Sequence, residues 1–266
     1  MTLQSISKIQ KQKLGFIVTG GNRGLGRALV RELAHEGHKV VYTHRSHLQD
    51  NINNSYNTLP VRCDVSDKND VYNLFDKAEA FLGNRIDGLI NNAALSGGYG
   101  SFTSMADDVL IDIIKTNVTG ALLCSKMAID VFNRQPSMGH IFNITGAGSD
   151  GHPTKNFAAY GASKAAMMQF TKSLRAELGN ENIGIHLISP GMMSTKLLMN
   201  NIPKSMETIL EIFSDSPDNV GKWAYPLIIN TINNKEKHSM NRYMNVQSII
   251  NKAIKASFTL LKKDAQ

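Results

Sequence analysis

Tyr160 and Lys164 are the two residues of this chain whose types and spacing most clearly indicate chemistry. Four residues apart in a helix, a phenol and an ammonium group lie on the same face. A tyrosine has an unperturbed pKa of about 10, and a nearby positive charge lowers it. The pair is therefore a candidate for acid–base catalysis, with Tyr160 as the proton donor. The alternative is a surface ion pair, which stabilises a fold by only about 0–1 kcal/mol.

A glycine-rich turn near the start of the chain is a candidate phosphate-binding site. An apolar run leads into residues 19–26, which read TGGNRGLG, and apolar residues then recur at helical spacing. This order predicts a strand, a tight turn and a helix whose N-terminus offers N–H groups to a pyrophosphate. The glycines permit the turn, the approach of a phosphate and close helix packing. The predicted cofactor-binding residues of the turn are Gly20, Asn22, Arg23, Gly24, Leu25 and Gly26.

The residues that follow the second predicted strand, near 39–43, indicate which dinucleotide binds. An acidic residue there binds the free 2′-hydroxyl of NAD, whereas a basic residue accommodates the 2′-phosphate of NADP. The chain offers His44 and Arg45 at this point, with Arg23 in the glycine turn. NADP(H) is therefore expected, with NAD(H) as the alternative. His44 and His47 lack a neighbouring cysteine or carboxylate to complete a metal site, so we expect no metal.

With these motifs in order, the sequence resembles the classical short-chain dehydrogenase/reductase family over almost its whole length. Residues 63–65 resemble its adenine-contacting segment, 90–94 its Asn-Asn-Ala-Gly motif, and 190–195 its nicotinamide-contacting segment. Asn117 falls where the family keeps an asparagine that holds a proton-relay water. The resemblance implies that Lys164 also holds the cofactor ribose. The cofactor-binding residues that it adds are Asp64, Val65, Asn91, Ala93, Tyr160, Lys164, Pro190, Gly191 and Thr195.

The serine that the family usually carries thirteen residues before the tyrosine is replaced here by Ala147. That serine donates a hydrogen bond to the substrate carbonyl. Either Thr145 or Ser149 could take this role if the loop follows a different path, and Ser149 is the preferred catalytic candidate. The alternative is that both are only turn residues of a glycine-rich loop.

Residues 139–226 are similar to the chlorophyll b reductase branch of the family, whose members use NADPH to reduce a formyl group on the chlorophyll ring. The resemblance implies an NADPH-dependent oxidoreductase that reduces an aldehyde or ketone to an alcohol. Methionines in residues 192–225 suit a bulky, apolar carbonyl substrate, either the pigment or another carbonyl compound. The alternative is a catalytically inactive NADP-binding regulatory or scaffold protein, which Ala94 and Ala147 would permit.

Alternating strands and helices predict one α/β domain over 1–266, with a doubly wound parallel sheet of the Rossmann type. Strands are expected near 15–19, 39–43, 59–62, 87–90, 139–144 and 184–188, and helices near 24–36, 67–82, 105–133 and 157–179. Residues 192–225 are predicted to form a helical substrate lid. Residues 245–266 are predicted to form a basic amphipathic helix, which we expect to pack on the domain rather than to lie on a membrane surface.

Composition narrows the class of protein. The net charge is +7, but the basic residues are scattered and no nucleic-acid motif is present, so we expect no nucleic-acid partner. We predict a cytoplasmic protein from three features of the sequence. It has only two cysteines, which we expect to be reduced, no apolar stretch of about 18 residues that could span a membrane, and no signal peptide. The resemblance implies a homodimer or homotetramer formed by the helices 105–133 and 157–179. The dimer is favoured, because the family's glycine-rich last strand has only Met240–Met244 as a candidate.

Overall fold

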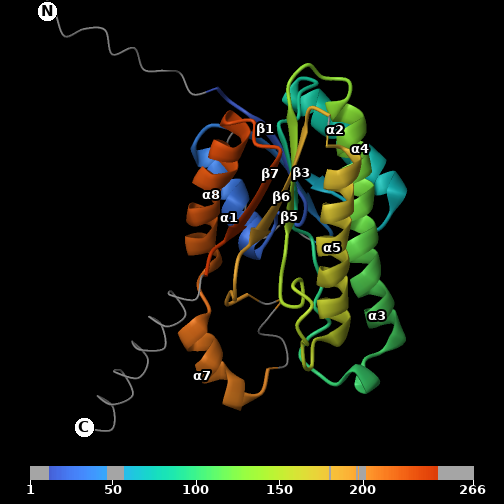
Figure 1. Ribbon diagram of the computed structural model, residues 1–266, viewed down its shortest axis with the longest axis vertical. Helices are drawn as coiled ribbons and strands as arrows, with labels where there is room; N and C mark the ends of the chain where they lie inside the picture. The colour runs from blue at the N-terminus through green and yellow to red at the C-terminus, as the bar shows by residue number, and fades with distance from the viewer. Residues whose placement is uncertain (1–11, 47–56, 180, 196, 198–201, 245–266) are drawn as a thin grey trace, which may run out of the picture.

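A parallel sheet of seven strands forms the middle layer of the computed structural model, which describes residues 12–46, 57–179, 181–195, 197 and 202–244 (Figure 1). The strand order is β3-β2-β1-β4-β5-β6-β7, and every neighbouring pair is parallel. The strands are β1 (Gly15–Val18), β2 (Lys39–His44), β3 (Thr58–Arg62), β4 (Gly88–Asn91), β5 (Gly139–Ile144), β6 (Ile183–Ser189) and β7 (His238–Arg242). The predicted doubly wound fold is confirmed.

Helices cover both faces of this sheet (Figure 1). One face carries α1 (Gly24–His35) and α8 (Pro217–Asn233), and the other carries α2 (Lys68–Leu82), α4 (Ala121–Phe132) and α5 (Ala158–Glu177). The 3₁₀ turn η1 (Phe102–Ser104) precedes α3 (Asp107–Ile114), which continues through the π-helical segment η2 (Lys115–Gly120) into α4. The short helix α7 (Lys204–Phe213) lies apart from these layers, beyond the carboxyl ends of the strands.

Two apolar cores explain why β1 is buried along its whole length. Successive strand residues point to opposite faces of a sheet, so a strand that is covered on both sides buries every side chain. In β1, Ile17 packs against α2 and α4, whereas Phe16 and Val18 pack against α1 and α8. The sheet is thereby covered on both sides, so that a ligand can approach it at the ends of the strands.

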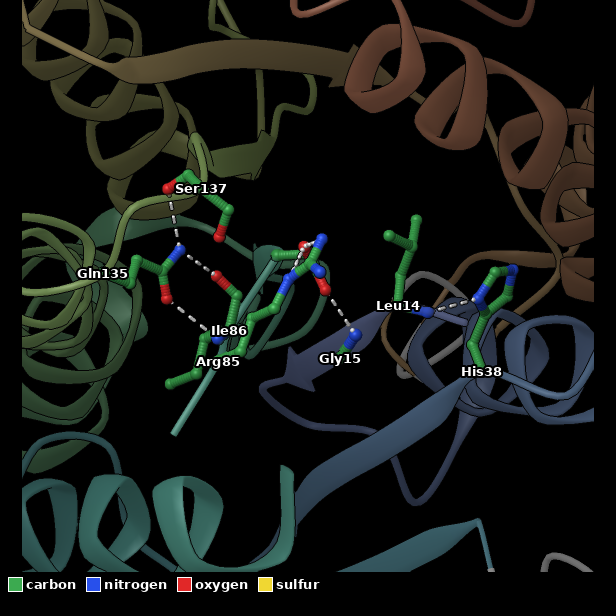
Figure 2. Close-up of polar contacts among 8 residues, drawn as sticks. Leu14, Gly15, His38, Arg85, Ile86, Gln135 and Ser137 are labelled. Carbon is green, nitrogen blue, oxygen red and sulfur yellow. Dashed lines mark hydrogen bonds and ion pairs between the residues drawn. The ribbon is translucent and has the colours of Figure 1, made fainter. Parts of the chain in front are cut away.

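Polar contacts fasten the amino ends of the strands (Figure 2). The Asp87 carboxylate is 2% exposed and accepts hydrogen bonds from Gly15 N at 2.8 Å and from Arg85 Nε at 2.8 Å. Burial raises the pKa of Asp87, and these two donors oppose that rise. Gln135 pairs with the backbone of Ile86, accepting from its N–H at 3.1 Å and donating to its carbonyl at 2.9 Å. This edge stabilises the sheet, and the candidate functional residues gather at the opposite one.

Two predicted boundaries are wrong. The last strand is His238–Arg242 rather than Met240–Met244, whereas the helix expected over 105–133 is present as the continuous α3, η2 and α4. The lid cannot extend to residue 225, because α8 begins at Pro217 and buries Val220 and Ala224 in the core. The Ser216 side chain accepts a hydrogen bond from the N–H of Asn219, which starts this helix. The helix predicted over 245–266 lies outside the described residues.

Within the described ranges, none of the helices combines the length and the hydropathy needed to cross a membrane. The same part of the chain brings no three histidine, cysteine or acidic side chains together as a metal site. Cys63 and Cys124 are both buried and free. Burial raises the pKa of each thiol, to about 12 for Cys63, so neither is a reactive thiolate.

Candidate active site

The glycine turn between β1 and α1 has the backbone geometry of a phosphate-binding loop. Gly20 and Gly24 adopt φ values of +65° and +54°, in the left-handed region that favours glycine. A side chain on Gly26 would overlap the Gly20 carbonyl oxygen and lie 2.5 Å from Nδ2 of Asn92. Asn22 is buried, and Arg23 is exposed at the N-cap of α1. The turn and the helix N-terminus therefore fit the pyrophosphate of a dinucleotide.

Three residues that the sequence prediction missed hold this turn in place. Thr19 Oγ1 accepts hydrogen bonds from the N–H groups of Asn92 and Ala93, each at 3.0 Å. Asn92 Nδ2 donates to the carbonyls of Thr19 at 2.9 Å and Gly20 at 3.1 Å. Thr43, in β2, accepts from Gly20 N at its side chain, at 2.8 Å. The second asparagine of the 90–94 motif was the signal that could have revealed this network.

At the end of β2, Arg45 is exposed and pairs with Asp64, with 3.7 Å between Nη1 and Oδ2. Burial tends to raise the pKa of Asp64, but hydrogen bonds from the Ser66 hydroxyl and N–H and the charge of Arg45 lower it below its usual value. Val65 is buried and packs against Gly120 of η2. The structure thus brings the predicted adenosine-binding residues of β2 and β3 together.

Tyr160 and Lys164 lie one turn apart on α5, as their spacing predicts. Lys164 is 5% exposed, donates from Nζ to the Ile144 carbonyl at 3.0 Å, and lies 5.6 Å from the centre of the Tyr160 ring. Burial lowers the pKa of Lys164 to about 8 and raises the pKa of Tyr160 to about 12. Burial of the phenol therefore opposes the lowering of the Tyr160 pKa by Lys164, which stays a prediction.

In the loop after β5, the Ser149 hydroxyl is already used in hydrogen bonds to Gly146, the residue that lies against Tyr160. Ser149 Oγ donates to the Gly146 carbonyl at 2.7 Å and accepts from the Gly146 N–H at 3.0 Å. A side chain on Gly146 would overlap the Tyr160 hydroxyl, so this turn lies directly against the phenol. Thr145 is buried, and its hydroxyl faces the Ile188 carbonyl at 3.4 Å. Ser149 is thus bonded to the turn that lies against the candidate proton donor, whereas the Thr145 hydroxyl faces β6.

Asn117 lies in η2, and its side chain acts as a clamp. Its Oδ1 accepts from Leu95 N at 2.7 Å, and its Nδ2 donates to Leu95 O at 2.8 Å and to Ser163 Oγ at 2.9 Å. Ser163 Oγ in turn donates to the Tyr160 carbonyl at 2.7 Å. Both amide hydrogens of Asn117 are therefore used to join the loop after β4 to α5. A π-helical turn at this point is typical of functional sites.

Asn91 is placed differently from the other predicted cofactor residues. It is 7% exposed, and its Nδ2 donates to Asn143 Oδ1 at 2.9 Å and to Ser125 Oγ at 3.0 Å. Its side chain therefore joins β4, β5 and α4 inside the core, whereas Ala93, two residues later, lies beside Gly20.

The segment after β6 reaches across to the glycine turn. Pro190 is buried, and Gly191 adopts a φ of +71°. A methyl group on Gly24 would lie 3.6 Å from Thr195 Cγ2, so these two predicted cofactor residues are neighbours. The loops that follow β1, β4 and β6 therefore converge at one edge of the sheet, where open α/β folds bind their ligands.

Comparison with known families and proteins agrees with this geometry. The family described as short chain dehydrogenase matches residues 16–205. Chlorophyll(ide) b reductase NOL of Oryza sativa subsp. japonica, named as chloroplastic, is 37% identical over 227 residues, covering 80% of this chain and 65% of that protein. The probable chlorophyll(ide) b reductase NYC1 of Arabidopsis thaliana, also named as chloroplastic, is 33% identical over 233 residues, covering 79% of this chain and 47% of that protein. The chain thus spans less than two thirds of these relatives, and the predicted resemblance to their branch is confirmed.

Solved structures share the fold. A 3-ketoacyl-(acyl-carrier-protein) reductase from Brucella melitensis, complexed with NADH, has a TM-score of 0.74 at 24% identity and covers 89% of this chain and 98% of its own. A short chain dehydrogenase from Burkholderia cenocepacia, in complex with NADP, has a TM-score of 0.72 at 22% identity and covers 87% and 96%. At these identities the likeness concerns the fold alone.

The prediction of a cytoplasmic protein is contradicted by these comparisons, because the plant relatives are named as chloroplastic proteins. The prediction rested on two cysteines expected to be reduced and on the expected absence of a membrane span and of a signal peptide. None of these features distinguishes one reducing compartment from another.

Proposed function

Because this chain belongs to the short-chain dehydrogenase family, an NAD(P)-dependent class of oxidoreductases, we propose that it reduces a carbonyl group to an alcohol with NADPH. The observation that carries the proposal is the pair formed by the half-buried Tyr160 and the buried Lys164, at the sheet edge that also holds the glycine turn. When bound there, the reduced nicotinamide supplies a hydride to the carbonyl carbon.

Tyr160 is the proposed proton donor to the carbonyl oxygen. Its raised pKa of about 12 keeps the phenol protonated at neutral pH, which is the state that a donor requires. An alkoxide is a stronger base than a phenolate of this pKa, so the transfer is favourable. Lys164, one turn away, stabilises the phenolate that forms and holds the cofactor ribose. Ser149 fixes the turn against which the phenol lies, and Asn117 fixes the helix that carries it.

NADPH is the proposed cofactor because two arginines are exposed here: Arg45 directly follows β2, and Arg23 is in the glycine turn, which is bonded to β2 through Thr43. An arginine–phosphate contact is charge-assisted and can be bidentate. Hydrogen bonds to charged groups stabilise by about 1.5–3 kcal/mol, so NADPH should bind at least about tenfold more tightly than NADH.

A formyl group on a large, flat, apolar ring is the proposed substrate class, supported by the names of the plant relatives. Incubation with NADPH and chlorophyllide b tests it, alongside a panel of simpler aldehydes and ketones. Formation of a 7-hydroxymethyl product supports the pigment as substrate. Turnover of the simpler carbonyls without that product contradicts it and leaves the carbonyl reductase in place.

A cofactor-binding protein without catalysis is the second candidate. It is favoured by one observation: the Ser149 hydrogen is already donated to Gly146, so a second donor to the substrate oxygen would require that bond to break. Binding of NADPH without consumption across the whole carbonyl panel would support this candidate.

We also propose a homodimer. Several large apolar side chains of α3 and α4 are exposed, and large exposed apolar patches mark interaction surfaces. They are Val109, Ile111, Ile114 and Leu122. Light scattering at micromolar concentration tests this, and a monomeric mass would contradict it.

A further inference from the structure

Asp215 pins together the two ends of the segment that leaves β6 and returns to α8. Its N–H donates to the Met192 carbonyl at 3.0 Å, and its own carbonyl accepts from Ser194 N at 3.1 Å and Ser194 Oγ at 3.3 Å. Met193 and Asp215 also form a parallel β-bridge. The backbone of Asp215 therefore determines where residues 192–194 lie.

The carboxylate of Asp215 is held in turn by two other elements. Oδ2 accepts from the Tyr243 hydroxyl at 2.6 Å, the short distance of a charge-assisted bond. Oδ1 accepts from Ser216 N at 2.8 Å and from Asn219 Nδ2 at 2.7 Å, at the start of α8. Tyr243 follows β7 directly, and its ring packs edge-on against Trp223, with 5.2 Å between ring centres. A chain of contacts thus runs from the end of the sheet through Tyr243 and Asp215 to residues 192–194.

This chain of contacts ends at the proposed cofactor site. Thr195 N donates to the Met193 carbonyl at 2.8 Å, and its methyl group lies beside Gly24 of the glycine turn. On the other side, Tyr243 N donates to the Ser189 carbonyl at 2.9 Å, and the Met244 side chain packs against Gly191. The residues that follow β7 therefore support the 189–195 segment at both of its ends.

We propose that Asp215 and Tyr243 are positioning residues for the nicotinamide half of the cofactor site. The Tyr243 hydroxyl fixes the Asp215 carboxylate, and the Asp215 backbone holds residues 192–195 against the glycine turn. The inference rests on the proposed NADPH function. It requires that loss of the Tyr243 hydroxyl weakens the binding of the nicotinamide half of the cofactor and leaves the binding of the adenosine half unchanged.

Tyr243→Phe tests this requirement, because it removes the hydroxyl and keeps the ring that packs against Trp223. We would measure dissociation constants by calorimetry for NADPH and for 2′,5′-ADP, which carries the phosphorylated adenosine half but no nicotinamide. The variant should bind NADPH about 5- to 50-fold more weakly and 2′,5′-ADP within about twofold of wild type. Asp215→Asn, which keeps the backbone bonds, should show the same selective loss.

Tyr225→Phe is the matched control. Tyr225 is on α8, like Trp223, but its hydroxyl lies 3.4 Å from His38 Nε2 and takes no part in the contacts of Asp215 described above. It should leave both dissociation constants unchanged. Wild-type protein that binds neither compound would contradict the proposed function itself. Wild-type binding to both, with Tyr243→Phe and Asp215→Asn either unchanged or equally weakened for both compounds, would overturn the positioning role alone.

Discussion

Acid should destabilise the folded protein through two buried histidines in the middle of the sheet. His140 on β5 and His186 on β6 are completely buried, with 3.0 Å between His140 Nδ1 and His186 Nε2. His186 Nδ1 lies 3.0 Å from Ser239 Oγ on β7. Burial lowers the pKa of His140 to about 4. Burial, with further contributions from His140 and Arg175, lowers the pKa of His186 to about 2.

The magnitude follows from proton linkage. In the unfolded chain each histidine has a pKa of about 6.5, so it gains a proton as the pH falls below that value, whereas the folded protein does not. Stability is therefore fully present above about pH 6.5 and is lost as the pH falls toward the folded-state values. At about pH 5 the loss is about 2 kcal/mol for each histidine, or about 4 kcal/mol for the pair. In a protein of this size, Tm should fall by roughly 10 °C.

Urea denaturation at about pH 7.5 and about pH 5 measures this loss. The fluorescence of Trp223, the only tryptophan of the chain, reports unfolding. The double variant His140→Gln/His186→Gln should lose most of the difference between the two pH values, whatever its own stability. His35→Gln, at a side chain that is 83% exposed, should keep the wild-type difference. A wild type whose unfolding free energy agrees within about 1 kcal/mol at both pH values would refute the reasoning, as would a double variant with the wild-type pH dependence.

Three further predictions concern the site. Gly26→Ala should weaken NADPH binding by more than about tenfold in calorimetry, because the added methyl group has no space in the turn. The control Gly100→Ala, where no atom lies within 4 Å of the added methyl group, should bind NADPH normally. Equal affinities of the two variants would contradict the phosphate-binding role. In steady-state kinetics, Ser149→Ala should lower kcat about tenfold by freeing the turn beside the phenol. Thr145→Val should retain a kcat near that of the wild type. Equal losses of kcat in the two variants would contradict the role of Ser149. At low salt, Arg45→Ala should raise the Kd of NADPH at least about tenfold and the Kd of NADH less than about threefold. Equal increases in the two Kd values would show that Arg45 does not bind the 2′-phosphate.

Much of the fold could be predicted because buried parallel strands read as short apolar runs. β1 follows this pattern, and the glycines after it locate the turn. The start of α8 was missed because residues 216–220 fall within the predicted lid, although Ser216 and Pro217 are typical of a helix N-terminus. Only the packing of Val220 and Ala224 on α1 distinguishes the two assignments.

The candidate site could be predicted in its local motifs but not in its long-range contacts. Gly20 and Gly24 need positive φ values, and this requirement is visible in the sequence as glycine. The clamp made by Asn117 depends on Leu95 and Ser163, which the sequence does not show to be neighbours. Burial in the folded chain raises the pKa of Tyr160, whereas the residues alone indicate only the opposing effect of Lys164.

The most direct test of the central claim follows NADPH consumption by wild type and Tyr160→Phe with a panel of aldehydes and ketones that includes chlorophyllide b. We predict carbonyl-dependent consumption by the wild type. Tyr160→Phe should lose turnover by at least about 100-fold, because the proton donor is removed, while its Kd for NADPH stays within a few fold. A variant that retains most of the wild-type rate would contradict Tyr160 as the proton donor and, with it, the proposed mechanism.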